Sequence, residues 1–151
     1  MALTDCVTYQ GIENGTCKFT PTGGSAGTLN LVTAISASPS VVLSAIKGDA
    51  DLHPRCQYVS AKNTSGSLTS TDIEKVEEAI TLGVAGVLTW DSIDKVNGTT
   101  VTYVIQDCTF SDNSTPFGAE TPTADSLSFS AGSAGNDGIT NPLARTFVAA
   151  P

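Results

Sequence analysis

The sequence has little positive charge. It contains only 7 Lys and Arg residues against 15 Asp and Glu, which gives a formal net charge of −8. The basic residues are scattered and form no cluster: Lys18, Lys47, Arg55, Lys62, Lys75, Lys95 and Arg145. A protein that reads nucleic acid needs such side chains to displace counterions from phosphates. The composition therefore argues against that class, and it predicts repulsion from anionic membranes.

Long hydrophobic runs are absent as well. No stretch reaches the ~18 consecutive apolar residues that a membrane-spanning helix needs. The first seven residues lack the basic segment and the apolar run of a secretory signal. We therefore expect a chain that is made in a cytoplasm, has no membrane partner, and leaves the cell only by lysis or within a larger particle.

Catalytic motifs are also missing. The single His, His53, would have to serve any Ser–His–Asp or Cys–His site, and no supporting motif surrounds it. The Gly-rich segment 132–135 lacks the spacing of a phosphate-binding loop. A glycosidase carboxylate pair stays an alternative, since its separation is spatial, but Trp90 is the only Trp that could stack on a sugar. We predict that the chain is not an enzyme and has no catalytic or cofactor-binding residue.

Cysteine is present but forms no metal-binding pattern. Cys6, Cys17, Cys56 and Cys108 could form two disulfides in any of three pairings. Without a secretory signal, reduced and mostly buried thiols are the better interpretation. The segment from His53 to Cys56 could begin a zinc site, but no Cys-x-x-Cys partner follows it.

Acidic residues that superficially suggest calcium have unsuitable patterns. Asp91, Asp94 and Asn97 are three residues apart, whereas an EF-type loop uses alternate residues. Asp49 and Asp51 have the right spacing but lack the remaining ligands. Solvated turns are the better interpretation of both groups, and we predict no metal site.

Ser and Thr are abundant in this chain, whereas charged residues are few. The chain has 16 Ser and 21 Thr, and charged residues make up only 15% of it, below the usual share of about 25%. High Thr and Val with low Lys and Glu is typical of β-strands and their turns. We predict a mainly β fold, a single β domain over residues 1–151, with 132–151 as a C-terminal extension or arm.

Alternating hydrophobicity predicts about eight or nine strands, arranged as a β-sandwich or β-barrel. The predicted strands are 5–10, 16–20, 28–35, 41–46, 55–61, 66–70, 84–90, 99–110 and 124–131, with a short apolar piece at 146–149.

The pattern also predicts how some of these strands are buried. In the segment 124–131, Leu127 and Phe129 are expected to face inward, with Ser126, Ser128 and Ser130 outward. Residues 41–46 are apolar on both faces, which favours a central strand, and Pro39 is expected to interrupt the strand pattern before them.

Turn signals separate these segments. We expect a turn at residues 63–66, a polar connection over 91–98 and a long loop over 111–122. The Asn-x-Ser/Thr sequences are expected to mark exposed turns: Asn14, Asn63, Asn97 and Asn113.

One short helix is predicted at about 71–82, flanking the sheet. Thr71 and Glu74 have the spacing of a capping box, with Thr71 as the N-cap residue, and Gly83 can end the helix. Ile73, Val76 and Ile80 share one face, which must pack on the sheet because so short a helix is unstable alone.

The chain is suited to contacts between identical subunits. Its long polar loops, Gly-rich tail and apolar Phe147-Val148 favour the exchange of strands or arms. Strand addition around a closed ring would leave no free sheet edge.

Three segments together resemble the tail tube (major tail) proteins of long-tailed bacteriophages. The first is a strand at 65–70 that leads into the capped helix and then into the apolar strand 86–90. The second is the strand 101–110 with its following loop, and the third is the strand 125–130 with the segment 133–140. The resemblance covers residues 65–140, about half of the chain.

This resemblance implies a structural virion protein without a cofactor. Six copies would form a ring, and stacked rings would form the tail tube, with inner sheets lining the lumen and arms bridging rings. The implied partners are further copies, the tape measure protein and the tail terminator protein, and DNA would pass through without specific binding. A negative net charge suits such passage, because an acidic surface repels the phosphates of DNA and does not bind them.

Beside the tail tube, which is the first possibility, the sequence leaves two further classes of function open. A capsid decoration protein or a surface adhesin-type β-sandwich module would share the composition and the strand pattern. A small carbohydrate-active enzyme is the third possibility, with its acid and base residues unplaced.

Overall fold

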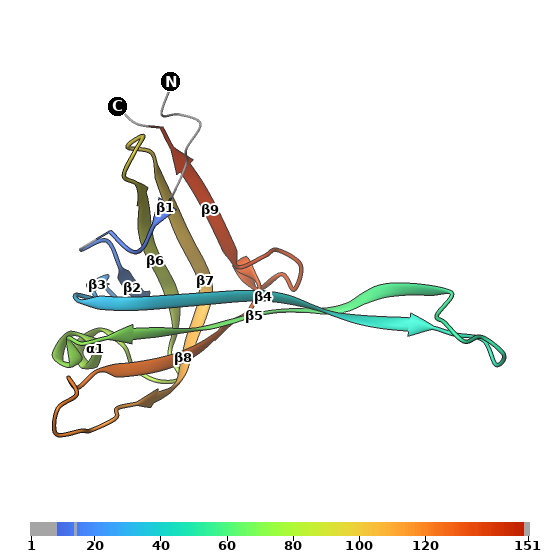
Figure 1. Ribbon diagram of the computed structural model, residues 1–151, viewed down its shortest axis with the longest axis horizontal. Coiled ribbons are helices and arrows are strands. Elements are labelled where there is room, and N and C mark those ends of the chain that lie inside the picture. Colours follow the sequence, from blue (N-terminus) through green and yellow to red (C-terminus); the bar gives the residue numbers. More distant parts are fainter. Residues whose placement is uncertain (1–8, 14, 150–151) are drawn as a thin grey trace.

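The computed structural model describes residues 9–13 and 15–149 (Figure 1). Its strands form one antiparallel sheet in the order β3-β2-β6-β7-β8-β5-β4, and β1 pairs with β6 while β9 pairs with β7. The strands are β1 Tyr9–Gln10, β2 Lys18–Pro21, β3 Gly27–Thr28, β4 Val32–Ile46, β5 Cys56–Ser70, β6 Ala85–Asp94, β7 Thr100–Ser114, β8 Asp125–Ala131 and β9 Leu143–Val148. The helices are α1 Ile73–Ala79 and the 3-10 turn η2 Ala134–Asn136.

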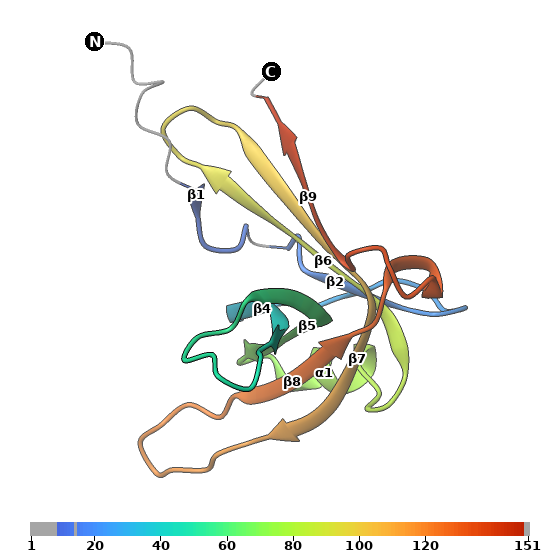
Figure 2. The same cartoon turned by 90° about the vertical axis from the view of Figure 1, so that its right-hand side faces the viewer.

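Strand β7 belongs to both halves of this sheet. Its residues 100–109 pair with β6 and its residues 100–105 pair with β9 on the other side, whereas residues 108–114 pair with β8. Asp107, with φ +50, lies where the pairing changes. The sheet folds over along β7, so that β6, β9 and the first part of β7 diverge from β8, β5 and β4 (Figure 2). The predicted mainly β fold with one short α-helix is confirmed, and the sheet does not close into a barrel.

The core joins the two halves through aromatic rings. Phe110 of β7 contacts Phe19 of β2 and Phe129 of β8 edge-to-face, with ring centroids 5.3 and 5.5 Å apart. Phe19 and Phe110 are fully buried and Phe129 nearly so. The predicted inward positions of Leu127 and Phe129 are confirmed. Such aromatic pairs contribute about 0.5–1.5 kcal/mol beyond their burial, so Phe110 is the centre of the packing between the halves.

Helix α1 is shorter than predicted and begins one residue later. Asp72, not Thr71, is the N-cap residue, and its Oδ1 accepts a hydrogen bond from the Lys75 amide at 3.3 Å. Thr71 lies just before this cap, and its backbone N–H donates to the Leu31 carbonyl. Val76 and Ile80 are buried against the core, whereas Ile73 is 44% exposed.

The ends of the helix and of β1 also differ from expectation. The helix ends at Ala79, and Gly83 follows it in a turn with φ +84, where its amide donates to the Phe110 carbonyl. The predicted strand 5–10 is represented by Tyr9–Gln10, because its earlier residues lie outside the described part of the chain.

Two predicted interruptions are wrong, because β4 and β5 each run unbroken for 15 residues. Pro39 stands within β4, opposite Thr64, and residues 63–66 continue β5 instead of turning. A proline, which has no backbone N–H, is tolerated because β4 is the last strand of the sheet and, among the described residues, no neighbouring strand on its outer side needs a donor there. The predicted connection 91–98 is also shorter, since β6 extends to Asp94.

Candidate assembly surface

The distal parts of β4 and β5, residues 41–62, form a hairpin that we call the arm. It extends away from the rest of the molecule (Figure 1). Its strands stay paired from Val41 and Lys62 to Ile46 and Cys56. The large apolar side chains of the arm are about half exposed or more: Val41, Val42, Leu43, Ile46, Leu52, Tyr58 and Val59.

The predicted central strand at 41–46 is therefore wrong for the single chain. This segment has the apolar composition of a buried strand, but it lies at the sheet edge and is exposed, with Leu43 at 54%. Soluble monomers rarely expose contiguous apolar patches larger than a few hundred Å². The arm thus combines the apolar composition of a buried strand with an exposed position, which makes it a candidate contact region.

The tip of the arm is held together by one acidic side chain. Asp51 Oδ2 accepts hydrogen bonds from the Gly48 amide and from Arg55 Nε, both at 2.7 Å. The Arg55 guanidinium and the Gly48 amide lower the pKa of the Asp51 carboxyl. Asp51, predicted to lie in a solvated turn, is thus a turn residue whose charge closes the loop between the strands.

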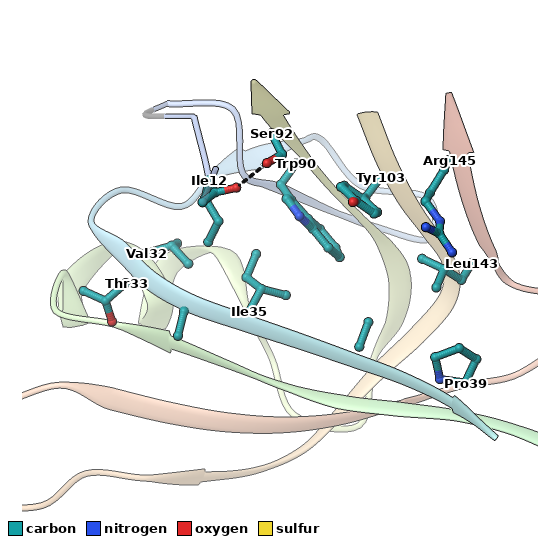
Figure 3. A pocket seen from close by; sticks show the side chains of 13 residues that line it. Ile12, Val32, Thr33, Ile35, Pro39, Trp90, Ser92, Tyr103, Leu143 and Arg145 are labelled. Atoms are coloured by element: carbon teal, nitrogen blue, oxygen red, sulfur yellow. Dashed lines mark hydrogen bonds between the residues drawn. The ribbon is translucent and has the colours of Figure 1, made fainter. Parts of the chain in front are cut away.

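A groove of about 600 Å³ lies between β4 and the strands β6, β7 and β9 (Figure 3). Its apolar wall includes Ile35, Leu143 and the stacked rings of Trp90 and Tyr103, whose centroids are 5.1 Å apart at 11°. Arg145 of β9 also lines it. Strands β4 and β9, which flank this groove, have no second strand partner among the described residues. The groove is therefore bordered by backbone that is open to strand addition.

A second groove, of about 890 Å³, lies at the root of the arm. It is lined by residues 39–41 of β4, by residues 59–64 of β5, and by residues 131–133 and 138–142 of the segment that leads from β8 to β9. That segment is held by Asp137, which accepts from the amides of Ile139 and Thr140 at 2.7 and 2.8 Å and from the Thr140 hydroxyl. These bonds, with that of the hydroxyl first, lower the pKa of Asp137 to about 2. Ile139 is 85% exposed beside the groove.

The cysteines differ in their environments. Cys17 and Cys108 are buried free thiols, and desolvation raises the pKa of each to about 12. Cys56 is a free and exposed thiol on the arm, so the expectation of mostly buried thiols does not hold there. Cys6 lies outside the described residues. His53 is exposed near the arm tip.

The residues considered for calcium do not converge. Asp91 and Asp94 stand three apart on β6, so their side chains leave opposite faces of the strand. Asp94 is fully buried, and it accepts from the Val96 amide at 3.0 Å and from Asn97 Nδ2 at 2.8 Å. Asp94 therefore organises the turn that joins β6 to β7.

The Asn-x-Ser/Thr sequences mark turns less often than expected. Asn97 lies in the turn after β6, but Asn63 lies in β5 and Asn113 in β7, while Asn14 is outside the described part. Within residues 9–13 and 15–149, no three His, Cys, Asp or Glu side chains are grouped to hold a metal ion. In the same part of the chain, no helix is long and apolar enough to cross a membrane.

Sequence reasoning missed the arm as the main exposed apolar feature. A signal for it was present, because a Gly- and Pro-containing loop at 48–54 separates two β-rich segments. The predicted breaks at Pro39 and at 63–66 nevertheless interrupt β4 and β5, so the sequence pattern does not reveal that these two strands continue unbroken into the arm.

Comparisons with known proteins identify a similar fold but no family. No family model matches the chain, and no curated protein matches its sequence. Among solved structures, it is similar to a chain of an extracellular contractile injection system, the PVC sheath–tube complex in its extended state. The TM-score is 0.59 at 10% identity, and the match covers 98% of this chain and 99% of that one. At this identity the likeness concerns the fold.

Proposed function

We propose that the chain is a structural subunit that assembles with identical copies into stacked hexameric rings, which form the tube of a phage-tail-type particle. The observation that carries this proposal is the arm, in which paired apolar strands stand exposed outside the core. Burial of such surface drives most protein association. A second copy is a suitable partner, because the chain itself supplies open strand edges beside an apolar groove.

The sheet geometry supports a ring in particular. The half-sheet β7-β8-β5-β4 ends at β4 on one side and, beyond Phe110, at β7 on the other. Joining the β4 edge of one copy to the opposite side of the next is a head-to-tail contact, which closes into a ring when the rotation allows. The arm then projects beyond its own subunit and can reach a neighbouring copy.

The fold likeness supports the class of particle. The similar chain belongs to a sheath–tube complex, and the match spans nearly all of both chains. We propose a non-catalytic role at a virion or a related particle, with the tape measure protein and the tail terminator protein as further partners. DNA would pass through the tube without specific binding, in keeping with the net charge of −8.

Electron microscopy of the purified full-length chain tests this function. We expect rings or tubes with a central channel wide enough for duplex DNA, together with species of high mass in sedimentation velocity that increase with concentration. A chain that stays monomeric at high concentration would contradict the proposal. Binding to capsids without tubes would favour the decoration module, and hydrolysis of a glycan that one Asp or Glu substitution abolishes would favour the enzyme.

A further inference from the structure

The outward face of the half-sheet β4-β5-β8-β7 is covered with hydroxyl groups. Strand register places Ser36, Ser67 and Ser128 in one row across β4, β5 and β8, and Asp112 of β7 continues it. Neighbouring rows on either side add Ser38, Ser65, Ser130 and Thr109, and Ala34, Thr69, Ser126 and Ser114. We call these rows the hydroxyl face. The residues between them along the strands, such as Leu68, Leu127 and Phe129, point into the core.

The chemistry of the hydroxyl face is unusual for an exposed sheet. Its positions are all Ser or Thr except Ala34 and Asp112, so it carries no Lys, no Arg and no large apolar side chain. Exposed sheets normally carry charges, and contact surfaces normally carry aromatic or aliphatic anchors. A face with neither offers a passing molecule only hydrogen bonds that water can replace at little net cost.

The position of this face follows from the proposed ring, on which the present inference rests. When the half-sheet is joined edge to edge around an axis, one of its faces must look toward that axis. The core side carries a second layer of strands and α1, which needs the larger space available at greater radius. The hydroxyl face is the uncovered side, so it takes the smaller radius.

We infer that the hydroxyl face lines the lumen of the assembled tube and forms a wall along which duplex DNA slides without being held. A phosphate backbone is retained by Lys and Arg, and each such contact adds to affinity and to salt dependence. Asp112, the one charged residue in these rows, repels phosphates instead. The wall therefore needs no excess of acidic residues to let DNA pass, because it has no cationic side chain that could hold a phosphate.

Cysteine accessibility tests where the face lies. Ser128 is exposed at the middle of the face, and Ser128→Cys is made in a Cys6→Ser, Cys56→Ser background. Circular dichroism and thermal unfolding first establish that the variant folds, and Ser65→Cys is a second reporter. In tubes we expect a small maleimide to react and a maleimide carried on a long polyethylene glycol chain to fail. Both should react with dissociated subunits.

A charge variant tests what the face does. Tubes of Ser128→Lys should bind short duplex DNA at low salt at least about tenfold more tightly than wild-type tubes, and added salt should abolish the gain. Thr121→Lys, in the exposed loop before β8, is the matched control and should give a smaller gain. Equal binding by wild-type and Ser128→Lys tubes would overturn the inference about sliding.

Different results would contradict the lumen inference and the proposed function. If the large reagent labels Ser128→Cys in tubes, or if neither reagent does, the face lies outside or in a contact, and only the lumen inference falls. If no tubes form under any condition, the proposed function falls and the inference falls with it.

Discussion

Gly66 of β5 lies directly opposite Phe129 of β8, and the aromatic ring occupies the space that a side chain at Gly66 would need. A Cβ built at Gly66 would lie 2.7 Å from Phe129 Cζ and would also collide with the Ser36 carbonyl of β4. The absence of a side chain therefore allows β4, β5 and β8 to approach one another at this position.

Replacement of Gly66 by Ala should therefore destabilise the folded chain. The Ser36 carbonyl belongs to the backbone of a paired strand and cannot move without loss of pairing, so we expect a loss of about 1–3 kcal/mol or more. Urea unfolding followed by Trp90 fluorescence measures it. Gly24→Ala is the matched control, because its added Cβ would meet only ordinary contacts at 3.4 Å and beyond. Equal losses in both variants would contradict the packing argument.

The free thiols should differ sharply in reactivity. Burial raises the pKa of Cys17 and Cys108 to about 12, so almost no thiolate exists at pH 8 and reagents cannot reach the sulfur. In a Cys6→Ser variant we expect one fast-reacting thiol, Cys56, with the other two reacting only after unfolding. Titration with a chromogenic disulfide reagent in native and denaturing buffer counts them. Rapid reaction of more than one thiol in the native protein would contradict the burial.

Asp137 should titrate well below an ordinary carboxyl group. Its pKa is lowered from 3.8 to about 2 by the Thr140 hydroxyl first and then by backbone amides. A lowered pKa in the folded state means that these bonds stabilise the loop above about pH 4 and are lost as the pH falls toward 2. Carbon-13 NMR of the carboxyl group measures the titration.

A Thr140 variant separates the causes of that shift. Thr140→Val removes the hydroxyl but keeps both amide donors, so the pKa of Asp137 should rise toward 3.8 without reaching it. An unchanged pKa in this variant would show that the hydroxyl has no part in the shift. Hydrogen bonds from the backbone amides to Asp137 would then be sufficient to hold the loop beside the second groove, at the root of the arm.

Local patterns predicted much of the sheet because alternation reports which side of a strand meets the core. The segment around Leu127 and Phe129 was predicted with the correct faces, since its apolar and Ser residues alternate strictly. Pro39 misled the prediction for a physical reason. Proline has no backbone N–H and is excluded from strand positions that must donate one, and whether β4 is an edge strand depends on the order of strands across the whole sheet.

The arm could not be predicted because burial depends on what surrounds a segment. Residues 41–46 are as apolar as a central strand, and the pattern cannot tell whether the covering layer comes from the same chain or from another copy. The hydroxyl face was partly visible as the outward Ser residues of 124–131. Its continuation across β5 and β4 became apparent only from the register that joins Ser128 to Ser67 and Ser36.

Polar substitutions on the arm should abolish assembly and leave the subunit folded. Leu43 and Val59 are directly paired across the arm and are 54% and 48% exposed. Thr is β-branched and favours strands, so it suits both positions while it removes apolar surface, and the thermal unfolding temperature of the subunit should change little.

The expected size of the assembly defect follows from burial. A fully buried Leu or Val side chain contributes about 1.5–3 kcal/mol, so the Leu43→Thr, Val59→Thr variant should raise the concentration needed for assembly at least about tenfold. Sedimentation and electron microscopy measure that concentration. Phe117→Thr, at a loop residue that is 84% exposed, removes a larger apolar side chain away from the arm and should assemble like the wild type. If the control loses assembly and the arm variant keeps it, apolar contact still drives association, but through the loop before β8 and not through the hairpin.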